Sequence, residues 1–105
     1  MATADGIMAQ VYVAFGQGTG DFTVPEDATQ VLHDRYFDKI TADVISQWEA
    51  TYAVQVLERI RAIGRMAAAQ ASANGDTEIS AALVTTAAER VEETSSTELC
   101  GPPPP

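Results

Sequence analysis

Apolar residues near the N-terminus follow a short alternating pattern. Val11, Val13 and Phe15 occupy every second position, which is typical of a β-strand with one buried face. A glycine-rich stretch and a second short apolar run, Phe22-Thr-Val24, come next. The pattern therefore predicts that residues 1–23 form an extended N-terminal arm, which can take the form of a short hairpin.

Beyond this arm the apolar spacing changes to that of helices. Pro25 favours a first helical turn, and Thr23 and Glu26 stand at the spacing of a capping box. Because both signals start at the same place, we predict a first helix over residues 25–37.

The next two helices are delimited by residues that cap or end helices. Thr41 is expected to cap a second helix that continues without proline to about Ser72, a length of about 30 residues, which is long for a domain of this size. Gly75 supplies a stop. Ser80 is expected to cap a last helix that runs to about Val91.

The long predicted helix is apolar on more than one side. At about 100° per residue, one stripe contains six large apolar side chains: Ile45, Trp48, Tyr52, Val56, Ile60 and Ile63. A second apolar set covers much of the remaining surface. A chain of 105 residues has few other elements to cover such a helix, so the stripe is predicted to be a dimer interface.

The charge is strongly negative and unevenly distributed. The chain has 15 Asp and Glu against 6 Lys and Arg, which gives a net charge of −9. All but one of the cations lie within residues 28–73, so an anion would be bound there. This balance excludes a protein that coats nucleic acid by charge alone. A single cysteine, Cys100, excludes a disulfide framework, and no apolar run reaches the ~18–20 residues that cross a bilayer.

The order of short helix, long helix and short helix resembles the histone-fold family over residues 24–92. Three stretches carry this resemblance: Lys39-Ile-Thr-Ala-Asp-Val44, Ala62-Ile-Gly-Arg-Met-Ala-Ala-Ala-Gln-Ala71 and Asp76-Thr-Glu-Ile-Ser-Ala-Ala-Leu83. Within the family, Val31-Leu-His-Asp-Arg-Tyr-Phe37 is most similar to the centromere protein X family, which pairs with centromere protein S. The resemblance implies an all-α histone fold, preceded by the N-terminal arm and followed by a disordered, proline-rich tail at residues 93–105.

What the resemblance implies for function is a subunit that pairs with a second histone-fold chain. The pair would bind DNA in a kinetochore or DNA-repair complex in the nucleus, with Arg35, Lys39, Arg61 and Arg65 as its DNA contacts. A solvated helix end or helix-surface ion pairs explain the same cations without DNA. The acidic loop Asn74-Gly-Asp-Thr-Glu78 departs from DNA-binding histones, which place Arg or Lys there.

Two alternatives remain open. The chain can serve a transcription assembly of the TFIID type with the same fold, or it can be a cytoplasmic helical structural protein that self-assembles without DNA. No nucleophile–base arrangement or pair of catalytic carboxylates can be assigned on helical spacing, so we predict a protein that is not an enzyme and takes no cofactor. His33, the single histidine, has no second ligand at helical spacing, so no metal site is predicted either.

Overall fold

The computed structural model describes residues 3–95, with side chains as far as Val91. Apart from one isolated β-bridge, the regular structure of this part of the chain is helical, so the predicted all-α class is confirmed. The elements are α1 (Ala4–Thr19), α2 (Glu26–Tyr36), the 3₁₀ turn η1 (Phe37–Lys39), α3 (Ala42–Ser46), the π-helical segment η2 (Trp48–Tyr52), α4 (Ala53–Asn74) and α5 (Ala81–Ser95).

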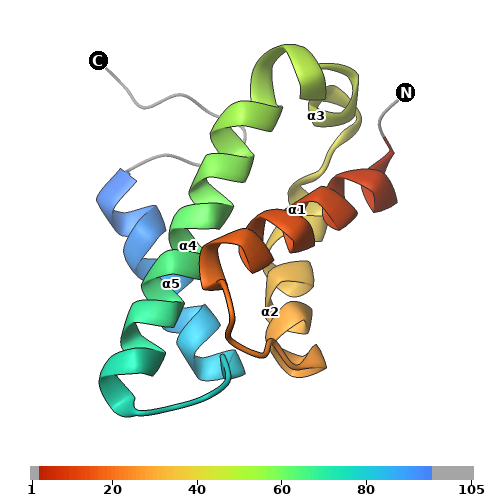
Figure 1. The fold of residues 1–105 in the computed structure, drawn as a ribbon. Helices are drawn as coiled ribbons and strands as arrows, with labels where there is room; N and C mark the ends of the chain where they lie inside the picture. The colour runs from red at the N-terminus through yellow and green to blue at the C-terminus, as the bar shows by residue number, and fades with distance from the viewer. Residues whose placement is uncertain (1–2, 96–105) are drawn as a thin grey trace.

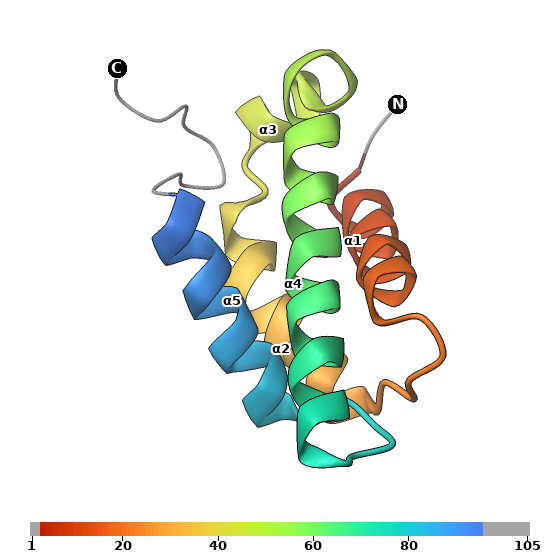
Figure 2. The same cartoon turned by 60° about the vertical axis from the view of Figure 1, so that its left-hand side comes forward.

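Helix α4 forms the axis around which the other helices pack. It contacts α1 on one side and α5 on the other, as Figures 1 and 2 show. Helix α2 contacts both α5 and α1, so four helices enclose a single core. The molecule is flat, with extents of 41 × 31 × 19 Å.

The prediction of an extended N-terminal arm is wrong, because residues 4–19 form a helix that belongs to the core. Ile7, Val11 and Phe15 are four residues apart, and all three are buried in the face that packs on α4. Val13, which the alternating pattern had grouped with them, is 62% exposed. A lone hairpin would have little to pack against, whereas a helix buries a complete face. Helix α1 therefore shares one hydrophobic core with the helices that follow residue 24.

The predicted long helix is interrupted before α4. Gln47 leaves helical geometry (φ −110°, ψ 12°), and the Ala53 amide donates to the Trp48 carbonyl, five residues back, as in a π-helix. The break turns the Trp48 indole into the core, where only 2% of it is exposed and its Nε1 donates to Gln10 Oε1 at 3.2 Å. The helix is therefore interrupted at the point where the large Trp48 ring is buried.

Most of the predicted helix ends are confirmed. Thr41 Oγ1 accepts from the Val44 amide at 3.3 Å, and Ser80 Oγ accepts from the Leu83 amide at 3.3 Å. Gly75 takes the left-handed conformation (φ 79°) that ends α4. Helix α5 continues to Ser95, so the predicted tail boundary at residue 93 falls inside it, and residues 96–105 lie outside the described residues.

The predicted capping box of α2 is wrong. Pro25 occupies the cap position, and no side chain caps the helix. The backbone of Thr23 instead pairs with the loop between α4 and α5, where the Ile79 amide donates to the Thr23 carbonyl at 2.8 Å. This bridge ties the two interhelical loops together. Among the described residues, no helix is long and apolar enough to span a membrane.

Candidate protein-docking surface

Helices α1 and α4 cross at closely spaced glycines. A Cβ on Gly64 would lie 2.5 Å from the Phe15 carbonyl oxygen, and one on Gly18 would lie 2.9 Å from the Gly64 Cα. No side chain can be added at either position unless the helices separate. The glycines therefore fix how closely α1 lies on α4, and with it the shape of the surface that the two helices share.

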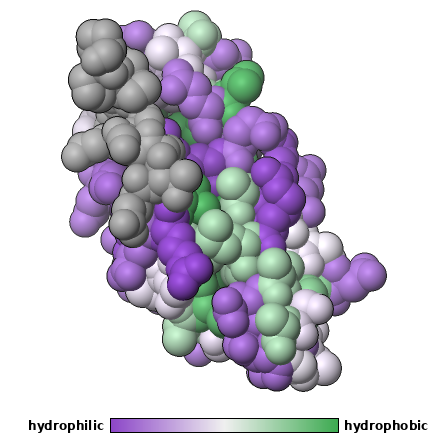
Figure 3. Space-filling view, turned by 90° about the vertical axis from the view of Figure 1, so that its left-hand side faces the viewer, coloured by the Kyte–Doolittle hydropathy of each residue, from purple (hydrophilic) through white to green (hydrophobic). Residues whose placement is uncertain are grey.

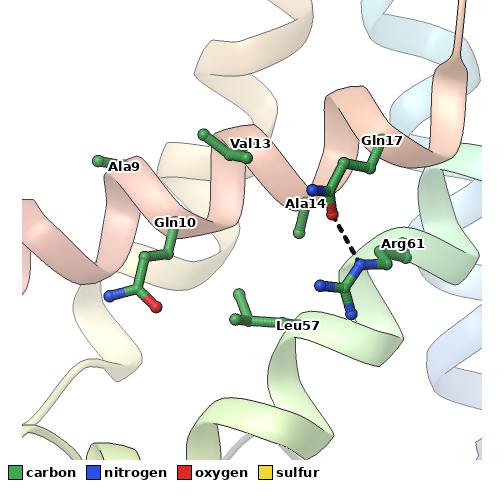
Figure 4. A pocket seen from close by; sticks show the side chains of 7 residues that line it. All are labelled: Ala9, Gln10, Val13, Ala14, Gln17, Leu57 and Arg61. Atoms are coloured by element: carbon green, nitrogen blue, oxygen red, sulfur yellow. Dashed lines mark hydrogen bonds between the residues drawn. The ribbon is translucent and has the colours of Figure 1, made fainter.

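A groove of about 250 Å³ runs along this junction. Its walls are mainly apolar, and seven residues line it: Ala9, Gln10, Val13, Ala14, Gln17, Leu57 and Arg61. In Figure 4, Leu57 projects from α4 into the space between the helices, while Ala9 and Val13 lie on the outer side of α1. The groove is thus an apolar shelf that continues onto the outer face of α1.

Hydrogen bonds hold the polar side chains along the groove. Arg61 Nε donates to Gln17 Oε1 at 2.8 Å, and Arg61 Nη1 donates to Glu58 Oε1 at 2.7 Å. Gln10 is held by the Trp48 indole described above. These contacts fix the orientation of both glutamines, so the surface is arranged before any partner arrives.

The two most exposed large apolar side chains lie on α1 and α4, and one of them, Val13, lines this groove. Val13 is 62% exposed on α1, and Val54 is 75% exposed on α4. Val54 precedes Leu57 by three residues and Arg61 by seven, so it belongs to the same row of α4. We call this surface the α1–α4 face, consisting of Ala9, Gln10, Val13, Gln17, Val54, Leu57 and Arg61.

The side of the molecule on which α5 lies has a different surface. Figure 3 shows hydrophilic side chains over most of that face, with a band of hydrophobic ones running through it. Between α4 and α5 the hollow measures only about 20 Å³, and Arg90 is among its lining residues. Met66, at 36% exposed, is the most exposed large apolar side chain there. The groove between α1 and α4 is therefore larger than the hollow between α4 and α5, and the α1–α4 face exposes more of its large apolar side chains.

The predicted dimer stripe is mostly inside the monomer. Trp48, Val56, Ile60 and Ile63 are at most 3% exposed, while Ile45 and Tyr52 are half-buried. The expectation that a partner must cover these residues is corrected, because α1 was not counted as a helix and it supplies much of the cover. The stripe forms the core of the single chain.

The predicted DNA contacts lie on two different parts of the fold. Arg35 is near the end of α2, and Lys39 ends η1 with its Nζ 6.0 Å from the centre of the Tyr36 ring. Arg61 and Arg65 lie on α4, beside the end of α1. Arg61 is already engaged by Glu58 and Gln17, so it takes part in the α1–α4 face.

Other titratable side chains form no built site in the described part of the chain. Within it, no group of three or more metal-ligating side chains comes together. His33 is stacked on Phe37, with ring centres 4.7 Å apart, and its Nδ1 lies 3.8 Å from Asp34 Oδ1. Burial and the neighbouring Asp34 carboxylate raise the pKa of Tyr12 above its ordinary value.

Comparison with known proteins gives no family. The chain matches no protein-family model, and searches of curated sequences and of solved structures find no match. What the α1–α4 face can do must therefore be inferred from its own residues.

Sequence reasoning missed most of this face. It selected Arg61 for DNA but passed over Gln10, Val13 and Gln17, because it took their segment for an extended arm. A helical signal was present, since Ile7, Val11 and Phe15 repeat every four residues. A helix with that buried stripe would have placed Ala9 and Val13 on its outer side.

Proposed function

We propose that this chain is a non-catalytic, protein-binding subunit and that the α1–α4 face is its docking surface. One observation carries the proposal. The exposed side of α1 has no charged side chain after Asp5, although 20% of the residues in the chain are charged. Loss of charge at the centre of an exposed patch is characteristic of protein interfaces.

The groove adds a physical reason for binding. Val13 and Val54 expose most of their surface to water, and Leu57 projects from α4 into the space between α4 and α1. Covering apolar area releases about 25 cal/mol for each Å² removed from water. Arg61 and Gln17 stand at the edge, where polar groups set orientation more than affinity.

Photo-crosslinking in the native host tests this function. A photoreactive amino acid would replace Val13 in one strain and Ala82 in another, because Ala82 is exposed on α5, away from α1. We expect a protein adduct of defined mass from position 13 and none from position 82. Equal yields from the two positions would overturn the proposal, and mass spectrometry of the adduct would identify the partner.

A second candidate function rests on the histone-fold resemblance of residues 24–92. There the partner is a second histone-fold chain, and the pair binds DNA in a kinetochore, repair or transcription assembly. The exposed cations Lys39 and Arg65 support it. The doubly charge-reversed variant Lys39→Glu, Arg65→Glu should then weaken DNA binding by the recovered complex and reduce its salt dependence. Unchanged DNA binding would remove this candidate.

A further inference from the structure

The last turn of α4 carries the single asparagine of the chain, and a glycine follows it. Asn74 is exposed at the end of α4, and Gly75 takes the left-handed conformation with φ 79°. Side-chain amides are among the thermolabile groups of proteins. Asparagine before glycine is their most reactive arrangement, because glycine has no side chain to block the approach of its own backbone nitrogen to the asparagine amide. This pair therefore provides the reactants for deamidation.

The reaction needs only these two residues and water. The Gly75 backbone nitrogen loses its proton and attacks the Asn74 side-chain carbonyl carbon, and the bond from that carbon to the side-chain nitrogen breaks. Ammonia leaves with the proton, and a five-membered succinimide ring remains. Water then opens the ring. Release of the ring nitrogen from the side-chain carbonyl gives aspartate, and its release from the backbone carbonyl gives isoaspartate, in which the main chain is longer by one carbon.

Hydrogen bonds at the C-terminal cap of α4 act on both reactants. The Gly75 N–H donates to the carbonyls of Ala71 and Ser72, with a distance of 3.1 Å to Ser72, so the attacking nitrogen keeps its proton while the cap is formed. Asn74 Oδ1 accepts from Gln70 Nε2 at 3.1 Å, and this donor stabilises the negative charge that develops on the oxygen during attack. The cap thus restrains the nucleophile, while Gln70 activates the carbon under attack.

This end of the helix can open while the core stays intact. Residues 72–78 are all exposed, and Ala71 is the last buried residue of α4. Helix ends with few buried contacts open at a much lower free energy than the whole fold. Opening of this one turn breaks the hydrogen bonds of the Gly75 amide and frees its nitrogen to reach Asn74.

We propose that Asn74 is a site of spontaneous deamidation in the folded protein, reached by local opening of the last turn of α4. The product places a new carboxylate at the C-terminus of α4, where the helix dipole disfavours negative charge. Asp76 and Glu78 follow in the same loop and add to the repulsion. In the isoaspartate form the longer main chain also misaligns the Gly75 amide with the carbonyls that it caps.

The modification acts on the loop that follows α4 and not on the α1–α4 face. Within this loop the Ile79 amide donates to the Thr23 carbonyl at 2.8 Å, so weakening of the cap loosens the tie to the segment before α2. Figure 2 shows this end of α4 at the bottom of the view, with the loop to α5 starting from it. Asn74 lies about three and a half turns beyond Arg61. The proposal therefore stands or falls independently of the docking function.

Peptide mapping of the full chain by mass spectrometry tests the site. After incubation of the folded protein in mildly alkaline buffer, the peptide with residue 74 should gain the mass of an amide-to-acid exchange and separate into aspartate and isoaspartate forms. The denatured chain should react faster by about tenfold or more, because no helix end has to open. Asn74→Gln is the matched control and should not react measurably, since glutamine would have to close a six-membered ring. Asp5–Gly6 can also form isoaspartate, but without a change in mass.

Urea separates local opening from global unfolding. Below the unfolding transition, the rate at residue 74 should change little with urea, because opening one turn exposes little surface. A rate that rises steeply with urea, in parallel with global unfolding, would overturn the local route. Equal rates in the folded and denatured chains would overturn the restraint by the cap, and an unreactive residue 74 in the folded chain would overturn the site itself.

The aspartate product can be made directly by substitution. Asn74→Asp should raise the equilibrium constant of unfolding by about two- to fivefold, the effect of one unfavourable charge at a helix end, and less at high salt. The uncharged Asn74→Gln variant should stay close to wild type. Equal stability of the Asn74→Asp and Asn74→Gln variants at low salt would overturn the proposed effect of the new carboxylate on α4.

Discussion

Helices α1 and α5 lie on opposite sides of α4, yet their outer faces differ. Helix α5 presents Glu89 and Arg90 to solvent, as a helix that faces water usually does. Helix α1 presents Ala9, Val13 and Gly16. Both helices bury an apolar stripe against the same core, so folding alone does not account for the difference.

The contrast extends to the way the two helices pack. At the α1–α4 crossing, Gly18 and Gly64 bring the backbones together, and Trp48 is hydrogen-bonded to Gln10 of α1. Helix α5 instead packs on the core through buried side chains and not through glycines, with Val84 and Ala88 fully buried. A helix that has no charge beyond Asp5 and is firmly fixed to the core is a rigid platform, which lowers the entropic cost of binding a partner.

The largest expected effect comes from removing the Trp48 side chain. Trp48→Ala should lower the free energy of unfolding by about 3–5 kcal/mol, because it empties a buried site and releases Gln10. Chemical unfolding should show this loss equally at low and high protein concentration, since the side chain is buried within one chain. A loss that disappears at high concentration would show that Trp48 is instead covered by a second subunit.

The glycine crossing gives the next largest effect. Gly64→Ala should destabilise the fold by about 1–3 kcal/mol, because the added methyl would meet the Phe15 carbonyl at 2.5 Å. Gly16→Ala is the matched control: no atom lies within 4 Å of its added Cβ. There the change should stabilise the helix by about 0.5–1 kcal/mol. Thermal unfolding measures the change in stability of both variants. A change of the same sign in the two variants would contradict the close crossing of α1 and α4.

Some of these structural features can be predicted from the sequence alone and others cannot. The helical class, the cap at Thr41, the stop at Gly75 and the cap of α5 at Ser80 were predictable, because each depends on local chemistry. The break before α4 was not, because it reflects burial of Trp48 against a distant helix. Residues 7–15 were misassigned because Val11, Val13 and Phe15 fit a strand while Ile7, Val11 and Phe15 fit a helix equally well.

The candidate site depended on that same choice. With α1 taken as an extended arm, the stripe from Trp48 to Ile63 had no cover and was assigned to a dimer. Once α1 is a helix, the stripe becomes core and the outer row of α1 becomes the exposed apolar surface. Arg61 was singled out in both interpretations, because its charge is visible in the sequence whereas its contact with Gln17 is not.

The polar edge of the face should contribute little to stability. Arg61→Ala removes bonds to Gln17 and Glu58, but Glu58 is 60% exposed, so we expect a loss of about 0.2–1 kcal/mol. Its effect should shrink at high salt. Urea unfolding at two salt concentrations measures this. A loss of several kcal/mol in the free energy of unfolding would show that Arg61 does more than hold Gln17 and Glu58 in place at the edge of the face.

The smallest effect concerns Tyr12, on the flank of α1 that faces α2. Burial first and the Asp34 carboxylate second raise the pKa of its phenol, so the folded state favours the neutral form. The resulting stability is fully present below the ordinary tyrosine pKa and is lost as the pH rises through the higher folded value. Asp34→Asn should lower the pKa of Tyr12 towards its ordinary value, since burial remains as the other cause.

Ultraviolet titration measures this shift, with Tyr12→Phe identifying the signal of Tyr12 among the three tyrosines. Asp27→Asn removes a carboxylate from the first turn of α2 and should leave the titration unchanged. An extended arm would leave Tyr12 in water with an ordinary pKa in every variant. A raised pKa that depends on Asp34 and not on Asp27 would therefore show that α1 is docked against α2 in solution, which fixes which side of α1 remains available to a partner.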